Sequence, residues 1–215
     1  MPDALCEQLA EVGSDAVRAH LVVGSGGNLS AREPGADTCW VTGTGSRLDR
    51  LGHTDFARVR IADGARVDTA GPVPSSEVAL HLHTYRARPD VNAVVHLHPQ
   101  SVLLLDALDE PVRLVTTDHA FYVRAVVRVG FHLPGSTELA AAAAAAVAGG
   151  ANCVVLAHHG CSVLAGTVEL AYQRARNLEE AARLTYRALL LGRPDLPDCP
   201  AEFVEHIEKG HIDVV

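Results

Sequence analysis

A chain of 215 residues with 48% hydrophobic residues is long enough to bury one substantial core, and no Pro/Ser-rich linker divides it. We therefore expect a single domain over residues 1–215. The net charge of −8 argues against a nucleic-acid or anionic-membrane surface, so any phosphate site must be built locally. Five cysteines without C-x-x-C spacing favour reduced thiols, and no apolar run approaches a membrane span. We expect a soluble, cytoplasmic protein without nucleic-acid or membrane partners.

The first half of the chain alternates helical and strand-like patterns. Apolar residues at helical spacing predict an amphipathic helix over residues 1–20, which a glycine-rich turn ends. Segments 28–32 and 37–42 predict a hairpin, and a third strand is expected over 57–61. Paired serines then cap a helix over about 75–88, which an Arg-Pro-Asp sequence stops.

The second half begins with a strand over residues 93–98. An irregular stretch up to residue 129 is expected to hold at least one more strand, and an alanine-rich helix follows over 137–148. Another strand approaches residue 158, and a long helix covers 167–191. Because this order is not a regular βαβ alternation, it predicts a central, mostly antiparallel sheet covered by helices.

A His-x-His pair ends the strand over 93–98. Strand side chains alternate between faces, so His96 and His98 project to the same side while Leu97 enters the core. A second apolar run ends in a pair of histidines and Gly160, where a glycine lets the chain turn sharply after a third ligand. Three imidazoles with one open position are typical of catalytic zinc. The alternative is that these are ordinary polar residues at strand ends.

Two glycine-rich turns, over 24–28 and 42–46, present backbone N–H groups that can form an anion-binding nest. Ser75 and Ser76 add the N-terminus of a helix, where free N–H groups and the helix dipole favour a phosphate. Each feature alone is more often a simple turn or cap. By itself, Glu77 would be an exposed glutamate in a first helical turn, and the remaining histidines would be surface or satisfied residues.

These motifs occur together in an order that resembles the class II aldolase/adducin family and its bacterial sugar-phosphate aldolases. The resemblance covers roughly residues 5–190. The motifs that carry it are Gly27-Asn28-Leu29-Ser30, Thr42-Gly43-Thr44-Gly45, Pro74-Ser75-Ser76-Glu77, Tyr85-Arg86-Ala87-Arg88-Pro89-Asp90, Ala93-Val94-Val95-His96-Leu97-His98-Pro99 and His158-His159-Gly160.

The resemblance implies an α/β fold with αβα layers around a mixed, mostly antiparallel sheet. It also implies a homotetramer with active sites between neighbouring subunits and a phosphorylated sugar as substrate. It implies a Zn²⁺ ion, or another divalent metal such as Mn²⁺ or Co²⁺, that acts as a Lewis acid while a ketose 1-phosphate is cleaved into dihydroxyacetone phosphate and an aldehyde. It assigns the metal to His96, His98 and His159, and makes Glu77 both a ligand and the acid/base. The positions matched to phosphate binding are Gly27, Asn28, Thr42, Gly43, Ser75 and Ser76.

The chain departs from the family in lacking a tyrosine where a neighbouring subunit supplies the group that handles the aldehyde-side proton. Tyr122, His119 and Asp118 are the candidates to replace it, and the alternative is that the reaction differs. Glu77 favours a lyase over a 4-epimerase, whose matching residue is typically aspartate, and Ser76 in place of lysine favours an aldolase or a dehydratase. The same motifs are also compatible with a decarboxylase of this fold or, less readily, with a non-catalytic adducin-like module.

Overall fold

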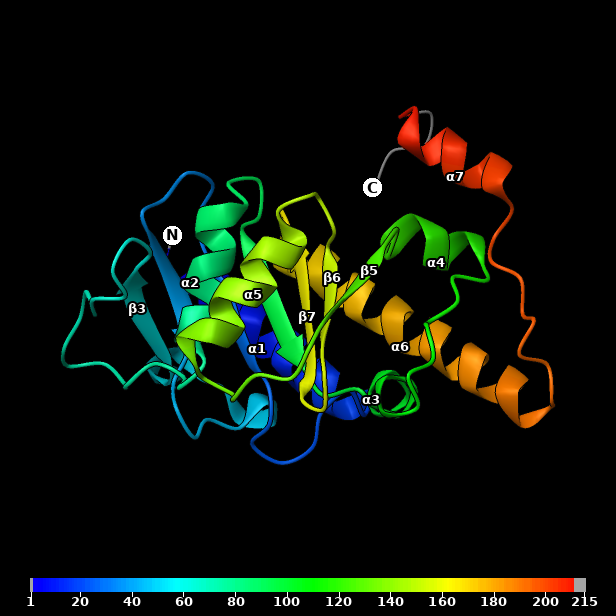
Figure 1. The fold of residues 1–215 in the computed structure, drawn as a ribbon. Helices are drawn as coiled ribbons and strands as arrows, with labels where there is room; N and C mark the ends of the chain where they lie inside the picture. The colour runs from blue at the N-terminus through cyan, green and yellow to red at the C-terminus, as the bar shows by residue number, and fades with distance from the viewer. Residues whose placement is uncertain (1, 211–215) are drawn as a thin grey trace.

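The computed structural model describes residues 2–210, which form a seven-stranded sheet in the order β3-β2-β1-β4-β7-β6-β5 (Figure 1). β5 and β6 pair in parallel, and all other neighbouring strands are antiparallel. The sheet is thus mixed and mostly antiparallel, which confirms the predicted fold class. The strands are β1 (Asn28–Ala31), β2 (Thr38–Thr42), β3 (Phe56–Arg60), β4 (Ala93–Leu97), β5 (Val126–Val129), β6 (Cys153–Leu156) and β7 (Gly160–Ala165).

Helices cover both faces of the sheet. α1, α3 and α6 lie against one face, and α2 packs on α5 against the other (Figure 1). In the described part of the chain, no helix has both the length and the apolar composition needed to cross a membrane. The helices are α1 (Pro2–Arg18), α2 (Val78–Ala87), α3 (Gln100–Ala107), α4 (Thr117–Tyr122), α5 (Thr137–Val147), α6 (Val168–Leu190) and α7 (Ala201–Glu208), with 3₁₀ turns η1 (Leu48–Arg50) and η2 (His53–Asp55).

The central strand β4 is buried on both faces because helices cover it from both sides. Val95 and Leu97 join the core under α1 and α6, whereas Val94 joins the core under α2 and α5. Since strand side chains alternate, His96 lies on the same side as Val94. A polar side chain therefore ends an apolar strand beneath α2.

Most predicted elements lie where the sequence places them, but the patterns miss β7 and the helices α3, α4 and α7. The predicted irregular stretch before residue 129 contains α3 and α4 as well as the expected strand, β5. With 8 and 6 residues, these helices are too short for a helical period to be recognised. β7 begins at Gly160, which the sequence suggested as a turn.

Candidate active site

Three neighbouring strands bring polar side chains together under α2. Asn28 on β1 and Ser162 on β7 both lie opposite His96 on β4. Residues opposite one another in antiparallel strands point to the same face, so these side chains form a row. All three are buried, and Ser162 Oγ lies 3.1 Å from His96 Nδ1. Buried polar groups need partners, and the next elements supply them.

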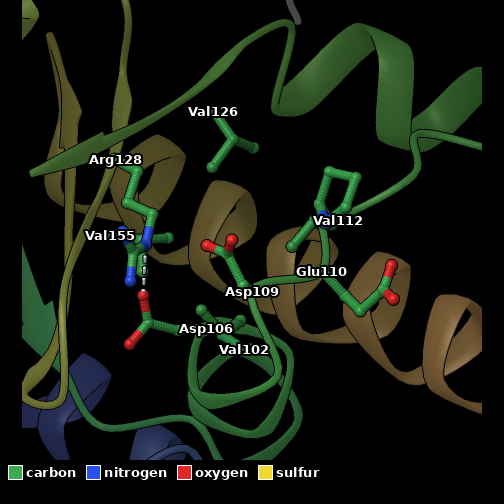
Figure 2. Close-up of a pocket in the computed structure, with 9 residues that line it drawn as sticks. Val102, Asp106, Asp109, Glu110, Val112, Val126, Arg128 and Val155 are labelled. Atoms are coloured by element: carbon green, nitrogen blue, oxygen red, sulfur yellow. Dashed lines mark hydrogen bonds and ion pairs between the residues drawn. The ribbon is translucent and has the colours of Figure 1, made fainter.

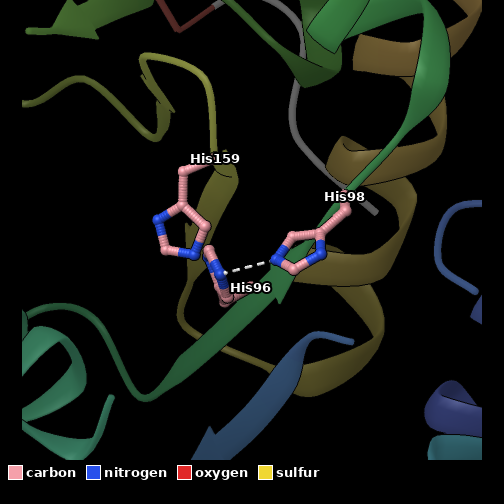
Figure 3. A group of neighbouring side chains, drawn as sticks. All are labelled: His96, His98 and His159. Carbon is pink, nitrogen blue, oxygen red and sulfur yellow. Dashed lines mark hydrogen bonds between the residues drawn. The ribbon is translucent and has the colours of Figure 1, made fainter. Parts of the chain in front are cut away.

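Three histidines converge at one end of this row (Figure 3). His96 lies near the end of β4, His98 follows it, and His159 comes from the turn between β6 and β7. Their ligand atoms all lie within 4.8 Å of one another, and the Nε2 atoms of His96 and His98 are 3.2 Å apart. Burial, assisted by His96 and His159, lowers the pKa of His98 to about 4. At neutral pH this imidazole is uncharged and has a lone pair available for a metal.

The turn that carries His159 is tighter than the sequence suggested. Its left-handed residue is His158, with φ +57°, so the expectation that Gly160 supplies the sharp turn is wrong. Gly160 is required for another reason: a Cβ there would lie 2.5 Å from His98 Cδ2 and 2.5 Å from the Leu97 carbonyl oxygen. The absence of a side chain at Gly160 lets β7 approach β4 closely enough to bring His159 to the other two imidazoles.

Glu77 is the N-cap residue of α2 and is buried, so the alternative of an exposed first-turn glutamate is wrong. Its backbone N–H donates to Ser75 Oγ at 3.2 Å. Its carboxylate lies between two imidazoles, with Oε2 3.3 Å from His96 Nε2 and Oε1 3.2 Å from His159 Nε2. Burial by itself raises the pKa of Glu77, but the adjacent imidazoles of His159 and His96 outweigh it and hold the pKa well below its usual range.

The donor set fits a divalent cation. Zinc binds imidazole nitrogen at about 2.0–2.1 Å with tetrahedral geometry, which separates its ligand atoms by roughly 3.3–3.5 Å. The closest contacts within the cluster have this size, at 3.2, 3.2 and 3.3 Å. Glu77 Oε1 is buried and makes no hydrogen bond of suitable geometry, although His159 Nε2 lies beside it. Glu77 Oε1 and His159 Nε2 therefore lie close together without bonding to each other, as two ligand atoms of one metal ion do.

A pocket of about 180 Å³ opens beside Glu77 and His98. The two glycine-rich turns and the start of α2 form its walls, as the anion-nest interpretation requires, and no Lys or Arg is among the described residues that line it. Five of the six residues that the resemblance assigns to phosphate lie here. The lining comprises Ser25, Gly26, Gly27, Asn28, Gly43, Thr44, Gly45, Ser46, Ser75, Ser76, Glu77 and His98.

Thr42 is the sixth residue assigned to phosphate, and it does not line the pocket. Its Oγ1 accepts a hydrogen bond from the Leu29 backbone N–H at 3.2 Å, and its carbonyl accepts from the Ser75 N–H at 2.9 Å. Asn28 lines the pocket, but its Nδ2 donates to Glu77 Oε2 at 2.8 Å. One hydrogen on that nitrogen is left for another acceptor.

Tyr122 and His119 lie on α4, and neither lines the pocket that contains Glu77. His119 is buried and forms a reciprocal cap with Thr116, whose Oγ1 accepts from the His119 N–H at 3.1 Å. Tyr122 lies at the end of this helix and stacks edge-on against Phe121, with ring centroids 5.1 Å apart. Within one chain, neither residue is brought to the histidine cluster.

The sequence did not single out Asp106, yet this residue supports the turn that carries His159. Its side chain is buried, Oδ1 lies 2.6 Å from Arg128 Nε (Figure 2), and Oδ2 accepts a hydrogen bond from the His158 backbone N–H at 2.8 Å. A lone acidic residue within the apolar helix α3 was the only signal in the sequence.

A family of known proteins matches most of this sequence. The family description "Class II Aldolase and Adducin N-terminal domain" matches residues 7–186, which is most of the chain. The chain belongs to this family. This match confirms the resemblance that the motifs indicated. The histidine cluster lies within the matched residues.

Individual relatives of this class II aldolase family member differ in their reactions. An L-fuculose phosphate aldolase from Methanocaldococcus jannaschii is 34% identical over 79% of this chain and 89% of the relative. A 3-oxo-tetronate 4-phosphate decarboxylase from Haemophilus influenzae is 30% identical over 84% of this chain and 86% of the relative. Among solved structures, an L-fuculose 1-phosphate aldolase superposes with a TM-score of 0.86 and 28% identity, covering 97% of each chain. Both curated relatives are named for phosphorylated compounds.

Proposed function

We propose that the protein is a metal-dependent aldolase that cleaves a ketose 1-phosphate into dihydroxyacetone phosphate and an aldehyde. One observation carries the proposal: the Glu77 carboxylate lies between His96 and His159 and also lines the pocket formed by the two glycine-rich turns. A metal-binding group and an anion-binding pocket thus meet at one side chain. A substrate with a phosphate at one end and two adjacent oxygens at the other matches this arrangement.

The phosphate is proposed to bind in the pocket beside Glu77, at backbone N–H groups and at the exposed hydroxyl of Ser76. Neutral donors at turns and at a helix N-terminus hold anions through oriented N–H groups and the helix dipole. Binding energy at this remote group positions the carbon–carbon bond that breaks. The substrate's carbonyl end would then lie toward His98, which lines the same pocket.

His96, His98, His159 and Glu77 are the proposed ligands of a divalent metal, with Zn²⁺ as the first candidate and Mn²⁺ or Co²⁺ as others. When bound, the metal supplies Lewis acidity that stabilises negative charge on the substrate oxygens. Glu77 is proposed to act as a proton shuttle: its carboxylate takes up one proton and passes it to C3 as the C3–C4 bond breaks and one proton leaves the C4 hydroxyl, which gives dihydroxyacetone phosphate. It has the position for this role because its carboxylate is held at the cluster and borders the pocket.

The reaction also requires that the C4 hydroxyl lose its proton as the aldehyde forms. Tyr122 is the proposed acceptor, supplied by a neighbouring subunit of a homotetramer, with His119 as second candidate. Both residues lie on α4 and neither lines the pocket of its own chain, which supports assigning them to a neighbour's site. Tyr122 is the first choice because His119 Nδ1 is already engaged by the Thr116 backbone N–H in the reciprocal cap.

A decarboxylase acting on a 3-oxo-tetronate phosphate is the second candidate, favoured by the relative from Haemophilus influenzae. The presence of Ser76, where such decarboxylases are expected to carry lysine, argues against it. The test is a coupled assay for dihydroxyacetone phosphate across ketose 1-phosphates, including L-fuculose 1-phosphate and deoxypentulose 1-phosphates, alongside carbon dioxide detection with 3-oxo-tetronate 4-phosphates. Release of dihydroxyacetone phosphate supports the aldolase. Release of carbon dioxide or water instead, from the best substrate, overturns it.

A further inference from the structure

A continuous chain of hydrogen bonds runs through the interior from α2 to the carboxylate of Glu77. Ser30 Oγ lies 2.7 Å from Tyr85 Oη and 2.7 Å from His81 Nδ1. The other ring nitrogen of His81, Nε2, is hydrogen-bonded to Asn28 Oδ1, and Asn28 Nδ2 lies 2.8 Å from Glu77 Oε2. All five side chains are buried.

The chemistry of the groups sets the direction of every bond in this chain. A carboxylate accepts hydrogen bonds only, so Asn28 presents its NH₂ group to Glu77 Oε2 and its carbonyl oxygen to His81. His81 must then donate from Nε2. Burial, with a smaller contribution from His96, lowers the pKa of His81 to about 3, so the ring is neutral and Nδ1 is an acceptor.

The hydrogen bonds from Tyr85 through Ser30 to His81 run in the same direction. Because His81 Nδ1 has a lone pair, Ser30 donates its only hydroxyl proton to it and accepts one from Tyr85. Burial raises the pKa of Tyr85 well above its usual value, so the phenol keeps its proton. Protons therefore point the same way along the whole chain, from Tyr85 to Glu77.

We propose that His81 is a positioning residue, which through its Nε2–H fixes the orientation of the Asn28 amide and thereby holds the Glu77 carboxylate at the histidine cluster. The importance of that position rests on the proposed function. If the Asn28 amide were reversed, its carbonyl oxygen would face the carboxylate, and two acceptors would lie within 3 Å of each other. Neither of them could then be satisfied, and the carboxylate would turn away.

Two substitutions of similar chemistry separate this role from simple filling of the core. The side-chain nitrogen of glutamine can occupy the place of histidine Nε2, whereas asparagine reaches only to the place of Nδ1. We expect His81→Gln to keep the donor to Asn28 and to bind Zn²⁺ within about threefold of the wild-type affinity. We expect His81→Asn to lose the hydrogen-bond donor to Asn28 and to bind Zn²⁺ about 10–100-fold more weakly than wild type. This is the usual effect of removing a group that orients a metal ligand. Chelator competition measures both.

The matched control is Thr84→Val on the same helix. Thr84 is buried and donates to the Leu80 carbonyl at 2.9 Å, so its loss lowers stability without touching the hydrogen-bond chain. Thr84→Val should lower the melting temperature and leave Zn²⁺ affinity unchanged. Wild-type affinity in His81→Asn, or equal losses in His81→Gln and His81→Asn, overturns the proposal.

NMR of the wild-type protein, without metal or substrate, tests the proposal even where the variants do not fold. Long-range ¹H–¹⁵N spectra distinguish the two tautomers of neutral histidine, and His81 should carry its proton on Nε2. A proton on Nδ1 overturns the proposal, because Asn28 would then lack its donor. If the Nε2–H tautomer is found but the wild-type protein binds no divalent metal and releases no dihydroxyacetone phosphate, the proposed function fails and the positioning of Glu77 by His81 stands.

Discussion

Glu77 makes its contacts with both carboxylate oxygens. Oε1 lies beside His159, and Oε2 lies beside His96 and accepts from Asn28. These contacts hold the carboxylate ionised and fixed in place at the border between the histidine cluster and the pocket. The side chains around it can be tested singly, because each is proposed to do something different.

Glu77→Gln should separate metal binding from proton transfer. The amide still offers an oxygen to the cluster but cannot exchange a proton at the reacting carbon, so the metal content should stay and turnover should fall by about 10²–10⁴. Elemental analysis and the dihydroxyacetone phosphate assay check the two parts. A rate within threefold of wild type would exclude the acid/base role.

His98→Ala should remove the metal and abolish turnover, because His98 is one of three imidazoles in the cluster and is neutral at pH 7. Since His98 is half-buried and follows β4, the fold should remain. His83→Ala on α2 is the control, as His83 is outside the cluster. Stoichiometric metal in purified His98→Ala would contradict the assignment.

Ser76→Ala should raise KM strongly for a phosphorylated substrate, because Ser76 is an exposed hydroxyl in the pocket. Ser75 is less suitable, since its hydroxyl accepts from the Glu77 N–H. The comparison substrate is the dephosphorylated sugar, whose KM should be unaffected by the substitution. Equal kcat/KM of the wild-type protein for both sugars would show that this pocket holds no phosphate.

At the scale of elements, Asp106 joins three segments that are far apart in the sequence. It lies on α3, pairs with Arg128 on β5 (Figure 2), and accepts from the backbone of His158 in the turn before β7. Burial by itself raises the pKa of Asp106, but the His158 N–H and Arg128 outweigh it and lower the pKa below its usual value. Asp106 thus stabilises the fold only while it is ionised.

Asp106→Ala should lower the free energy of unfolding by about 1–3 kcal/mol at pH 7, because the His158 N–H loses its acceptor. The folded-state pKa is depressed, so the contribution is complete above the unfolded pKa of about 3.9 and is lost as pH falls through the folded value. Urea unfolding at pH 7, 5 and 3 should therefore show the difference from wild type shrinking toward pH 3. Glu110→Ala is the control. Glu110 is an exposed acid that lines the same surface cavity as Asp106, and its removal should change the free energy of unfolding little. An undiminished difference at pH 3 would contradict this account.

At the scale of the whole molecule, the C-terminal part of the chain extends away from the sheet. α7 packs on α4 and stands clear of the strands (Figure 1), and Tyr122 on α4 lines a separate hollow with residues of α6. Within one chain, the pocket of the glycine-rich turns meets the histidine cluster at Glu77 and His98, and neither Tyr122 nor His119 lines that pocket. A neighbouring subunit is the proposed source of the residue that accepts the C4 hydroxyl proton.

Tyr122→Phe should slow cleavage by about tenfold or more with unchanged metal content, because the phenol is the proposed proton acceptor. Co-expression of Tyr122→Phe and His98→Ala chains should restore activity, since mixed oligomers contain some sites with an intact Tyr122 from one subunit and an intact His98 from the other. With random mixing, about a quarter of the sites are intact. If neither Tyr122→Phe nor His119→Ala slows cleavage, another group accepts this proton. No recovery in the mixture would place each site within one chain.

The sequence by itself determined most of the sheet-and-helix layout, apart from β7 and the helices α3, α4 and α7, and the identity of the histidine cluster. Period-two alternation put His96 and His98 on one side of a strand, and the glycine-rich turns predicted the pocket. Local patterns suffice for such features because they depend on neighbours within a few residues.

Only the tertiary structure decided what depends on distant contacts. The burial of Glu77, the commitment of Asn28 to it, and the hydrogen bonds of His81 arise where β1, β4 and α2 meet. The need for Gly160 comes from the approach of β7 to β4, not from its own turn. A side chain's partners across a sheet depend on strand order and register, which no short stretch of sequence specifies.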